Sequence, residues 1–117
     1  MDTLVKLVGI KIKQIRKSRE LTQDELAEKC GLQTSYLAGV ERGDRNITLQ
    51  TLEKITVGLE VSSKKIFNFS DINVEQNHLE KNEILMILDS LLESKSEEEI
   101  RLILNIATDI FNTYNKK

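Results

Sequence analysis

The sequence contains no proline, and only five of its 117 residues are glycine. No stretch of useful length alternates apolar and polar residues with a period of two, which argues against strands. Apolar residues recur instead at three- and four-residue spacing, the period of an amphipathic helix. The sequence therefore predicts an all-α protein of one or two small domains.

Cysteine, histidine and long apolar runs are equally scarce. Cys30 and His78 are the single residues of their kinds, so we expect neither an internal disulfide nor a metal site. No apolar run reaches the roughly 18 residues that span a bilayer, and the N-terminus lacks a secretion signal. These absences favour a reduced, cytoplasmic protein without a cofactor. Enzyme activity is not expected, because there is no nucleophile–base arrangement, glycine-rich phosphate loop or metal cluster.

Residues 21–42 predict two short helices joined by a tight turn. Thr22 and Glu25 have the spacing of a capping box at the start of the first helix. Gly31 ends that helix, because glycine adopts a left-handed conformation at little cost. The second helix begins near Gln33. The residues expected to face the core are Leu26, Ala27, Cys30, Tyr36, Leu37 and Val40.

The outward positions of the second helix carry small and mostly polar residues. They are Gln33, Thr34, Ser35, Ala38 and Gly39. The second helix of such a pair can lie in the major groove of DNA, with its N-terminal residues at base edges. Glutamine, threonine and serine side chains can hydrogen-bond to bases, and a threonine methyl can contact a thymine methyl. The pattern predicts a helix that reads DNA.

A wider set of spaced positions resembles the helix-turn-helix domain of the lambda repressor/Cro class, also called the Xre family. The resemblance covers about residues 7 to 69 and implies a five-helix DNA-binding domain. It also implies a transcriptional regulator that binds double-stranded DNA. The matching positions are residues 8–11, 15–16, 21–23, 26–27, 31–32, 40–43, 49, 52, 55 and 59–62.

We expect further DNA contacts from residues in and around the two central helices. The resemblance implies that Gln23 binds a DNA phosphate at the N-terminus of its helix. Arg42 and Arg45 would contact phosphates or guanine edges, and Asn46 would donate to a phosphate. Tyr36 would pack inward, point its hydroxyl at a phosphate, or do both. The complete expected DNA-binding set is Gln23, Gln33, Thr34, Ser35, Tyr36, Ala38, Gly39, Arg42, Arg45 and Asn46.

Arg16 and Glu41 match an arginine–glutamate pair that is common in this family. An arginine fork can bind a carboxylate through two hydrogen bonds. The resemblance implies a buried structural pair that fixes the DNA-reading helix against the first helix. The alternative is an exposed pair with little effect on stability.

Apolar stripes predict the other helices of the first domain. The first helix spans about residues 4–19, Thr48 caps a fourth at about 49–59, and Ser62 or Ser63 caps a fifth. The stripes expected to face the core are Leu4, Val8, Ile12 and Ile15, then Leu49, Leu52, Ile55, Thr56 and Leu59, with Phe67 and Phe69 closing it. The lysines expected to face solvent or phosphate are Lys6, Lys11, Lys13 and Lys17.

Charge and composition change after residue 69. Residues 1–69 hold 12 Lys and Arg against 9 Asp and Glu, a net charge of +3, whereas residues 70–117 hold 5 against 10, a net charge of −5. This asymmetry is typical of a DNA-binding module joined to a module with another role. We predict a helix-turn-helix domain at 1–69, a linker at 70–78 and a helical oligomerisation hairpin at 79–117.

The predicted hairpin has more apolar surface than two helices can bury on each other. Ser94, Lys95 and Ser96 separate its helices, and Ser96 with Glu99 forms a second capping box. Twofold pairing with another copy of the chain is the commonest way to cover such a surface. The residues expected at the homodimer interface are Ile84, Leu88, Leu91, Ile103, Leu104, Ala107, Ile110 and Phe111.

Two functions are compatible with this pattern. The leading prediction is a sequence-specific dimeric repressor that reads a palindromic operator through the helix at about 33–41. The alternative is a protein-interaction module, such as an antitoxin or adaptor, whose C-terminal helices bind a different protein or an antagonist peptide. A membrane partner is not expected.

Overall fold

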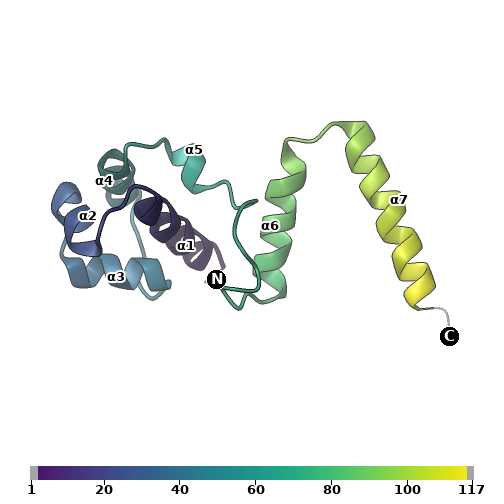
Figure 1. Cartoon of the computed structure of the whole chain (residues 1–117), viewed down its shortest axis with the longest axis horizontal. Coiled ribbons are helices and arrows are strands. Elements are labelled where there is room, and N and C mark those ends of the chain that lie inside the picture. Colours follow the sequence, from purple (N-terminus) through teal and green to yellow (C-terminus); the bar gives the residue numbers. More distant parts are fainter. Residues whose placement is uncertain (1–2, 116–117) are drawn as a thin grey trace.

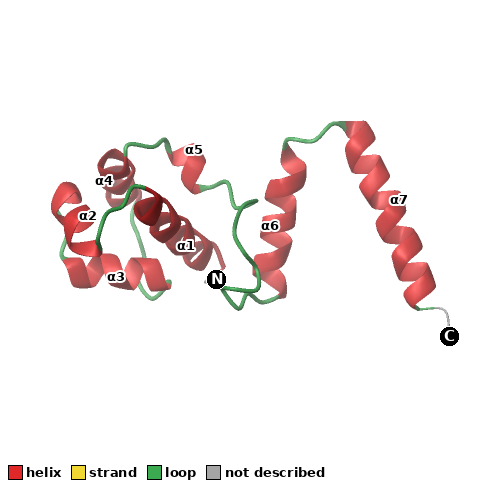
Figure 2. Ribbon diagram, in the orientation of Figure 1, coloured by secondary structure: helices red, strands yellow, loops and turns green. Residues whose placement is uncertain are grey.

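The computed structural model describes residues 3–115, which form seven helices and no strand (Figures 1 and 2). The predicted all-α class is confirmed. The helices in chain order are α1 (Thr3–Ser18), α2 (Gln23–Cys30), α3 (Thr34–Arg42), α4 (Leu49–Leu59), α5 (Ser63–Ile66), α6 (Lys81–Glu93) and α7 (Glu97–Tyr114). Helices α1–α5 gather into one bundle, α6 lies against it beside α1, and α7 extends away from α6 (Figure 1).

The hydrophobic core lies among the first five helices. α1 packs against α3, α3 against α2, and α2 against α4, while α5 closes the bundle next to α4. Its completely buried apolar side chains are Leu7, Ile12, Leu26, Leu37, Ile55 and Ile66. Cys30 is buried in the same cluster, and this burial raises the pKa of its thiol.

Gly9 allows α1 to approach the backbone of α3. A Cβ atom at Gly9 would lie 2.2 Å from the carbonyl oxygen of Val40 and 3.0 Å from that of Glu41. Both obstacles are backbone atoms, which cannot move aside as the end of a flexible side chain can. The position of α3 relative to α1 therefore depends on the absence of a side chain at residue 9.

Local signals at the helix ends have the predicted geometry. Thr22 and Glu25 form the expected capping box, and so do Ser96 and Glu99. The backbone N–H of Thr22 donates to Glu25 Oε1 at 2.8 Å and holds the pKa of this carboxyl below its usual range. Gly31 ends α2 with a φ of 69°, in the left-handed region.

Three apolar residues that we expected in the core are exposed instead. Leu4 is 45% exposed, Leu49 83% and Phe67 40%. Leu4 and Leu49 belong to the first turns of α1 and α4, and Phe67 follows the last residue of α5. Helical periodicity identifies which face of a helix is buried, but it does not show how far along the helix the neighbouring elements cover that face. The predicted burial was therefore wrong at helix ends.

The segment between α5 and α6 is not helical, but it is packed against the bundle. Ile72 is buried in the core, and Val74 and Leu79 pack against the core from outside. Beyond it, Ile87 on α6 also joins the core, and Lys6 on α1 lies 3.2 Å from the carboxylate of Glu83. The predicted linker is thus an ordered connection that places α6 beside α1.

Helix α7 stands clear of the rest of the chain. It has no buried residue, and it extends away from α6 after a short turn (Figure 1). The two C-terminal helices follow one another as predicted, but within this chain they do not close into a packed hairpin. None of the described helices combines the length and the apolar composition needed to cross a membrane.

The close approach at Gly9 generates a stability prediction. We expect Gly9→Ala to lower the free energy of unfolding by about 1–3 kcal/mol, because the added methyl group overpacks the α1–α3 contact. A helix interior normally favours alanine over glycine by about 1 kcal/mol. A lower free energy of unfolding for Gly9→Ala would therefore point to the close approach and not to helix propensity. Urea unfolding of the full chain measures the change. An unchanged or higher midpoint would contradict the close approach.

Candidate nucleic-acid interface

The start of α3 presents polar side chains on the surface of the bundle. Gln33 precedes the helix as its N-cap and is exposed, as is Ser35, while Thr34 is half-buried. Leu37 and Val40 are buried on the opposite side and hold the helix against the core. The side chains predicted to read bases are therefore accessible, and their contact with DNA stays a prediction.

A buried ion pair joins the end of α3 to α1. Arg16 Nε donates to Glu41 Oε2 at 2.7 Å, and Arg16 Nη2 donates to Glu41 Oε1 at 3.0 Å. The arginine side chain is 8% exposed and the glutamate side chain 2%. The pair has the two-bond geometry and the burial implied by the family resemblance.

Helix α2 is connected to the same ion pair. Gln23 Nε2 donates to Glu41 Oε1 at 3.0 Å, and Arg16 Nη1 donates to the carbonyl of Leu21 at 2.7 Å. The amide of Gln23, predicted to bind phosphate, thus has a partner inside the protein. It carries a second N–H, so its phosphate contact stays a prediction.

Tyr36 links α3 to the loop that follows it. Its hydroxyl donates to the backbone carbonyl of Asn46 at 2.9 Å, and its half-buried ring packs against the core. Of the two roles considered for Tyr36, inward packing is present. The hydroxyl holds the loop, which leaves the side chain of Asn46 exposed.

Gly39 is not exposed on the outer face of α3 as we expected, because the side chain of Arg45 covers it. Gly39 is buried, and a Cβ atom there would lie 2.5 Å from Arg45 Cγ. The missing side chain makes room for the arginine stem to lie across α3. Arg45 itself is exposed, so its guanidinium is held next to the outer face of the helix.

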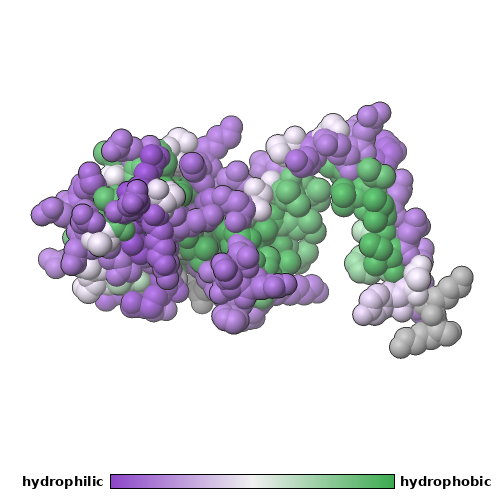
Figure 3. Space-filling model, in the orientation of Figure 1, coloured by the Kyte–Doolittle hydropathy of each residue, from purple (hydrophilic) through white to green (hydrophobic). Residues whose placement is uncertain are grey.

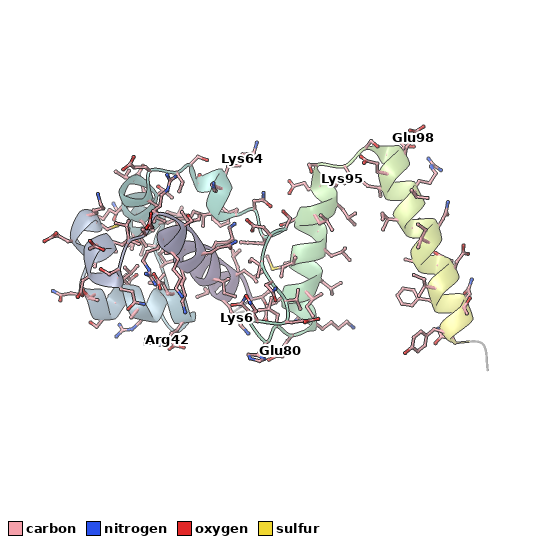
Figure 4. The ribbon with its side chains drawn as sticks, viewed as in Figure 1. Lys6, Arg42, Lys64, Glu80, Lys95 and Glu98 are labelled. Carbon is pink, nitrogen blue, oxygen red and sulfur yellow. The ribbon has the colours of Figure 1, made fainter. Side chains whose placement is uncertain are left out.

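Arg42 ends α3 and lies beside the loop. Its Nε donates to Asp44 Oδ2 at 2.8 Å, and both side chains are largely exposed. Gly43 follows it with a φ of 80°, in the left-handed region that glycine adopts at little cost. Figure 4 shows Arg42 on the opposite side of the bundle from Lys64 on α5.

Lys11 contradicts its predicted place on a solvated or phosphate-binding face. It is buried, and its Nζ lies 2.7 Å from Asp71 Oδ1. Sequence reasoning missed the partner because Asp71 lies in the segment assigned as a linker. A signal was available, since Lys11 falls between Val8 and Ile15 on the apolar face of α1.

Comparison with known proteins agrees with this geometry. A family model described as helix-turn-helix, HTH_3, matches residues 12–66. Control protein C.BamHI of Bacillus amyloliquefaciens is 42% identical over 72 residues, which cover 60% of this chain and 89% of that protein. The chain belongs to the HTH_3 family. It is therefore a DNA-binding helix-turn-helix transcriptional regulator.

The similarity to two further proteins extends beyond the first five helices. The HTH-type transcriptional regulator SinR of Bacillus licheniformis is 32% identical over 100 residues, covering 85% of this chain and 90% of SinR. The restriction-modification controller protein C.Esp1396I, solved as a tetramer with its natural 35 base-pair operator, is 38% identical with a TM-score of 0.54. That similarity covers 73% of this chain and 95% of the controller chain.

The buried ion pair of this HTH_3 protein generates a second stability prediction. Arg16→Ala should lower the free energy of unfolding by about 3–5 kcal/mol, because it leaves the Glu41 carboxylate buried without its cation. Arg101→Ala is the matched control. It removes an exposed arginine that pairs with Glu97 on α7, and should cost about 1 kcal/mol or less. Equal melting temperatures for wild type and Arg16→Ala would show that the pair contributes little.

Proposed function

We propose that this protein is a sequence-specific dimeric repressor that reads a palindromic operator through α3. The observation that carries the proposal is the construction of α3 itself. Its polar start is exposed, whereas its far end is fixed to α1 and α2 by the buried network of Arg16, Glu41 and Gln23. A rigidly held helix with free polar side chains is suited to direct reading of base edges.

Some residues of α3 and the following loop contact base edges in this proposal, and others contact the phosphate backbone. Gln33, Thr34 and Ser35 can hydrogen-bond to base edges, and Ala38 offers an apolar contact to a thymine methyl. Arg45 lies across Gly39 and supplies the fork that pairs best with guanine. Arg42, Asn46 and the second N–H of Gln23 would then contact the phosphate backbone.

A palindromic operator follows from pairing two copies of the chain. A dimer places two recognition helices in the major groove about one helical turn apart, roughly 34 Å or 10 base pairs. The operator-bound tetramer of the related C.Esp1396I shows that a relative uses several copies on one DNA site. A dimer bound over a promoter represses by occupying the DNA that the polymerase needs.

The operator prediction is tested by selecting duplexes from a random pool with the full chain. We expect an enriched palindrome. Arg45→Ala should weaken binding to it by about 1–3 kcal/mol for each lost guanine contact and relax specificity at that base. Arg101→Ala, which removes an exposed arginine on α7, should change neither.

Two results would contradict the operator prediction. One is a selection in which no common sequence is enriched at low salt. The other is an Arg45→Ala variant that selects the same sequence as wild type with the same discrimination at every position. The first rejects sequence-specific binding, and the second rejects base reading by Arg45.

The apolar faces of α6 and α7 supply the surface for dimerisation. Figure 3 shows hydrophobic residues along the facing sides of these two helices. The exposed apolar residues on them include Ile84, Leu85, Leu88, Leu91, Ile100, Ile103, Leu104, Ile106, Ile110 and Phe111. Contiguous apolar surface of this extent marks an interaction site. The occupant that we propose is the same surface of a second copy, in a twofold arrangement.

The same surface also supports the second candidate, a docking site for a different protein. No described residue of this chain covers the apolar stripe of α7. A foreign helix with its own apolar face could compete with the second copy and so act as an antagonist of the dimer. The oligomeric state of the pure protein separates the two candidates.

A substitution on α7 tests the dimer without disturbing the bundle. Phe111→Asp should convert a dimer to a monomer in light scattering after size exclusion, because it places a charge in the interface. Phe111 is 62% exposed in the single chain, so the thermal stability of the bundle should not change. Asn105→Asp adds the same charge to the opposite, polar face of α7 and should remain dimeric.

Two results of the light-scattering measurement would contradict dimerisation through α7. A wild-type chain that is monomeric at tens of micromolar would reject the homodimer and favour the foreign partner. A Phe111→Asp variant that stays dimeric would instead move the interface away from α7.

A further inference from the structure

A polar groove of about 550 Å³ lies beside the recognition helix, outside the surface already assigned to base reading. Its walls come from four separate parts of the chain. Lys13 and Lys17 line it from α1, Gln23 from the start of α2 and Arg42 from the end of α3. Residues 71–77, which precede α6, form the remaining wall. The groove therefore borders two residues already proposed to contact the DNA backbone.

The charge available in this groove is positive. Its two carboxylates are already paired, Glu41 with Arg16 and Asp71 with Lys11. Lys13 and Lys17 are exposed and form no ion pair with the residues that the structure describes. Arg42 shares one N–H with Asp44 in an exposed pair, which has little energetic weight against a stronger anion.

Residues 71–77 are held in place on the groove wall. Asp71 is bound to the buried Lys11, and Ile72 is buried in the core. The Oδ1 atom of Asn73 accepts from the backbone N–H of Gln76 at 2.8 Å, which folds the segment into a turn. This turn uses only the oxygen of Asn73. Neither the Nδ2 group of Asn73 nor the side-chain amide of Gln76 forms a hydrogen bond with a described residue.

We propose that this groove binds the DNA sugar–phosphate backbone next to the bases that α3 reads. Lys13 and Lys17 supply charge, and the amides of Asn73 and Gln76 donate hydrogen bonds to phosphate oxygens. The inference rests on the proposed operator binding and extends it to a segment outside the helix-turn-helix. The connection to the C-terminal helices is then part of the DNA interface, so the same segment that positions α6 also contacts the operator.

A charge series at Gln76 tests the proposal by the salt dependence of operator binding. The full-length chain is compared as wild type, Gln76→Lys and Gln76→Glu, on the duplex selected by the wild type. A cation placed on a phosphate steepens the slope of log K against log salt by about 0.9 per protomer. We expect that change for Gln76→Lys, or roughly a threefold difference per protomer between 50 and 200 mM salt. Gln76→Glu should weaken binding at every sequence.

A matched control series and a second test variant separate a local contact from a general effect of charge. Lys64→Gln and Lys64→Glu run through the same three side chains on α5, on the far side of the bundle from Arg42 (Figure 4). Asn73→Asp keeps the oxygen that forms the turn and replaces the donating amide with a carboxylate. It should weaken operator binding as Gln76→Glu does, without lowering the melting temperature.

The outcomes distinguish this proposal from the proposed function. Wild type that binds the selected duplex, with slopes for the Gln76 series no different from those of the Lys64 series, would reject the groove and leave operator binding intact. Wild type that binds no duplex would reject both. A hydroxyl-radical footprint gives an independent readout. Loss of protection in Gln76→Glu, relative to wild type, only at the backbone positions that flank the bases read by α3 supports the groove.

Discussion

The buried ion pair of Arg16 and Glu41 is the contact on which the placement of α3 depends. Taking both charges out of water is costly, and the cost is offset only when their remaining hydrogen-bonding atoms are also satisfied. Here Gln23 donates to the carboxylate, and the carbonyl of Leu21 accepts from the guanidinium. The network therefore connects α1, the start of α2 and the end of α3. Gly9 complements it, because the missing side chain sets how closely α1 and α3 approach.

Helix α1 also connects the DNA-binding bundle to the C-terminal helices. The ammonium group of Lys11 is buried and needs the carboxylate of Asp71, since a buried charge without a partner is strongly unfavourable. One and a half turns earlier, Lys6 reaches Glu83 on α6. These two contacts and the burial of Ile72 hold the connecting segment against the bundle. The position of α6 relative to α3 is consequently set through α1.

Helix α7 is built on a different principle from the first five helices. Its capping box and its acidic first turn stabilise it locally, but none of its side chains is buried within this chain. Most of the stability of a protein helix comes from packing an apolar face, and α7 has that face without a covering neighbour. In the proposed function, base reading belongs to the single chain, whereas the C-terminal unit is completed by association with a second copy. In a dimer formed through the C-terminal helices, the two DNA-binding bundles would match the two half-sites of one operator.

The sequence by itself determined the helical class, the capped helix ends and the turn at Gly31, because these depend on residues a few positions apart. Arg16 and Glu41 could be paired only through the family resemblance, since 25 positions separate them. Tertiary structure alone decided the rest. Lys11 is buried because Asp71, 60 positions away, reaches it, and the same segment forms one wall of the polar groove. Periodicity describes one helix at a time, whereas burial depends on which distant backbone comes to lie against it.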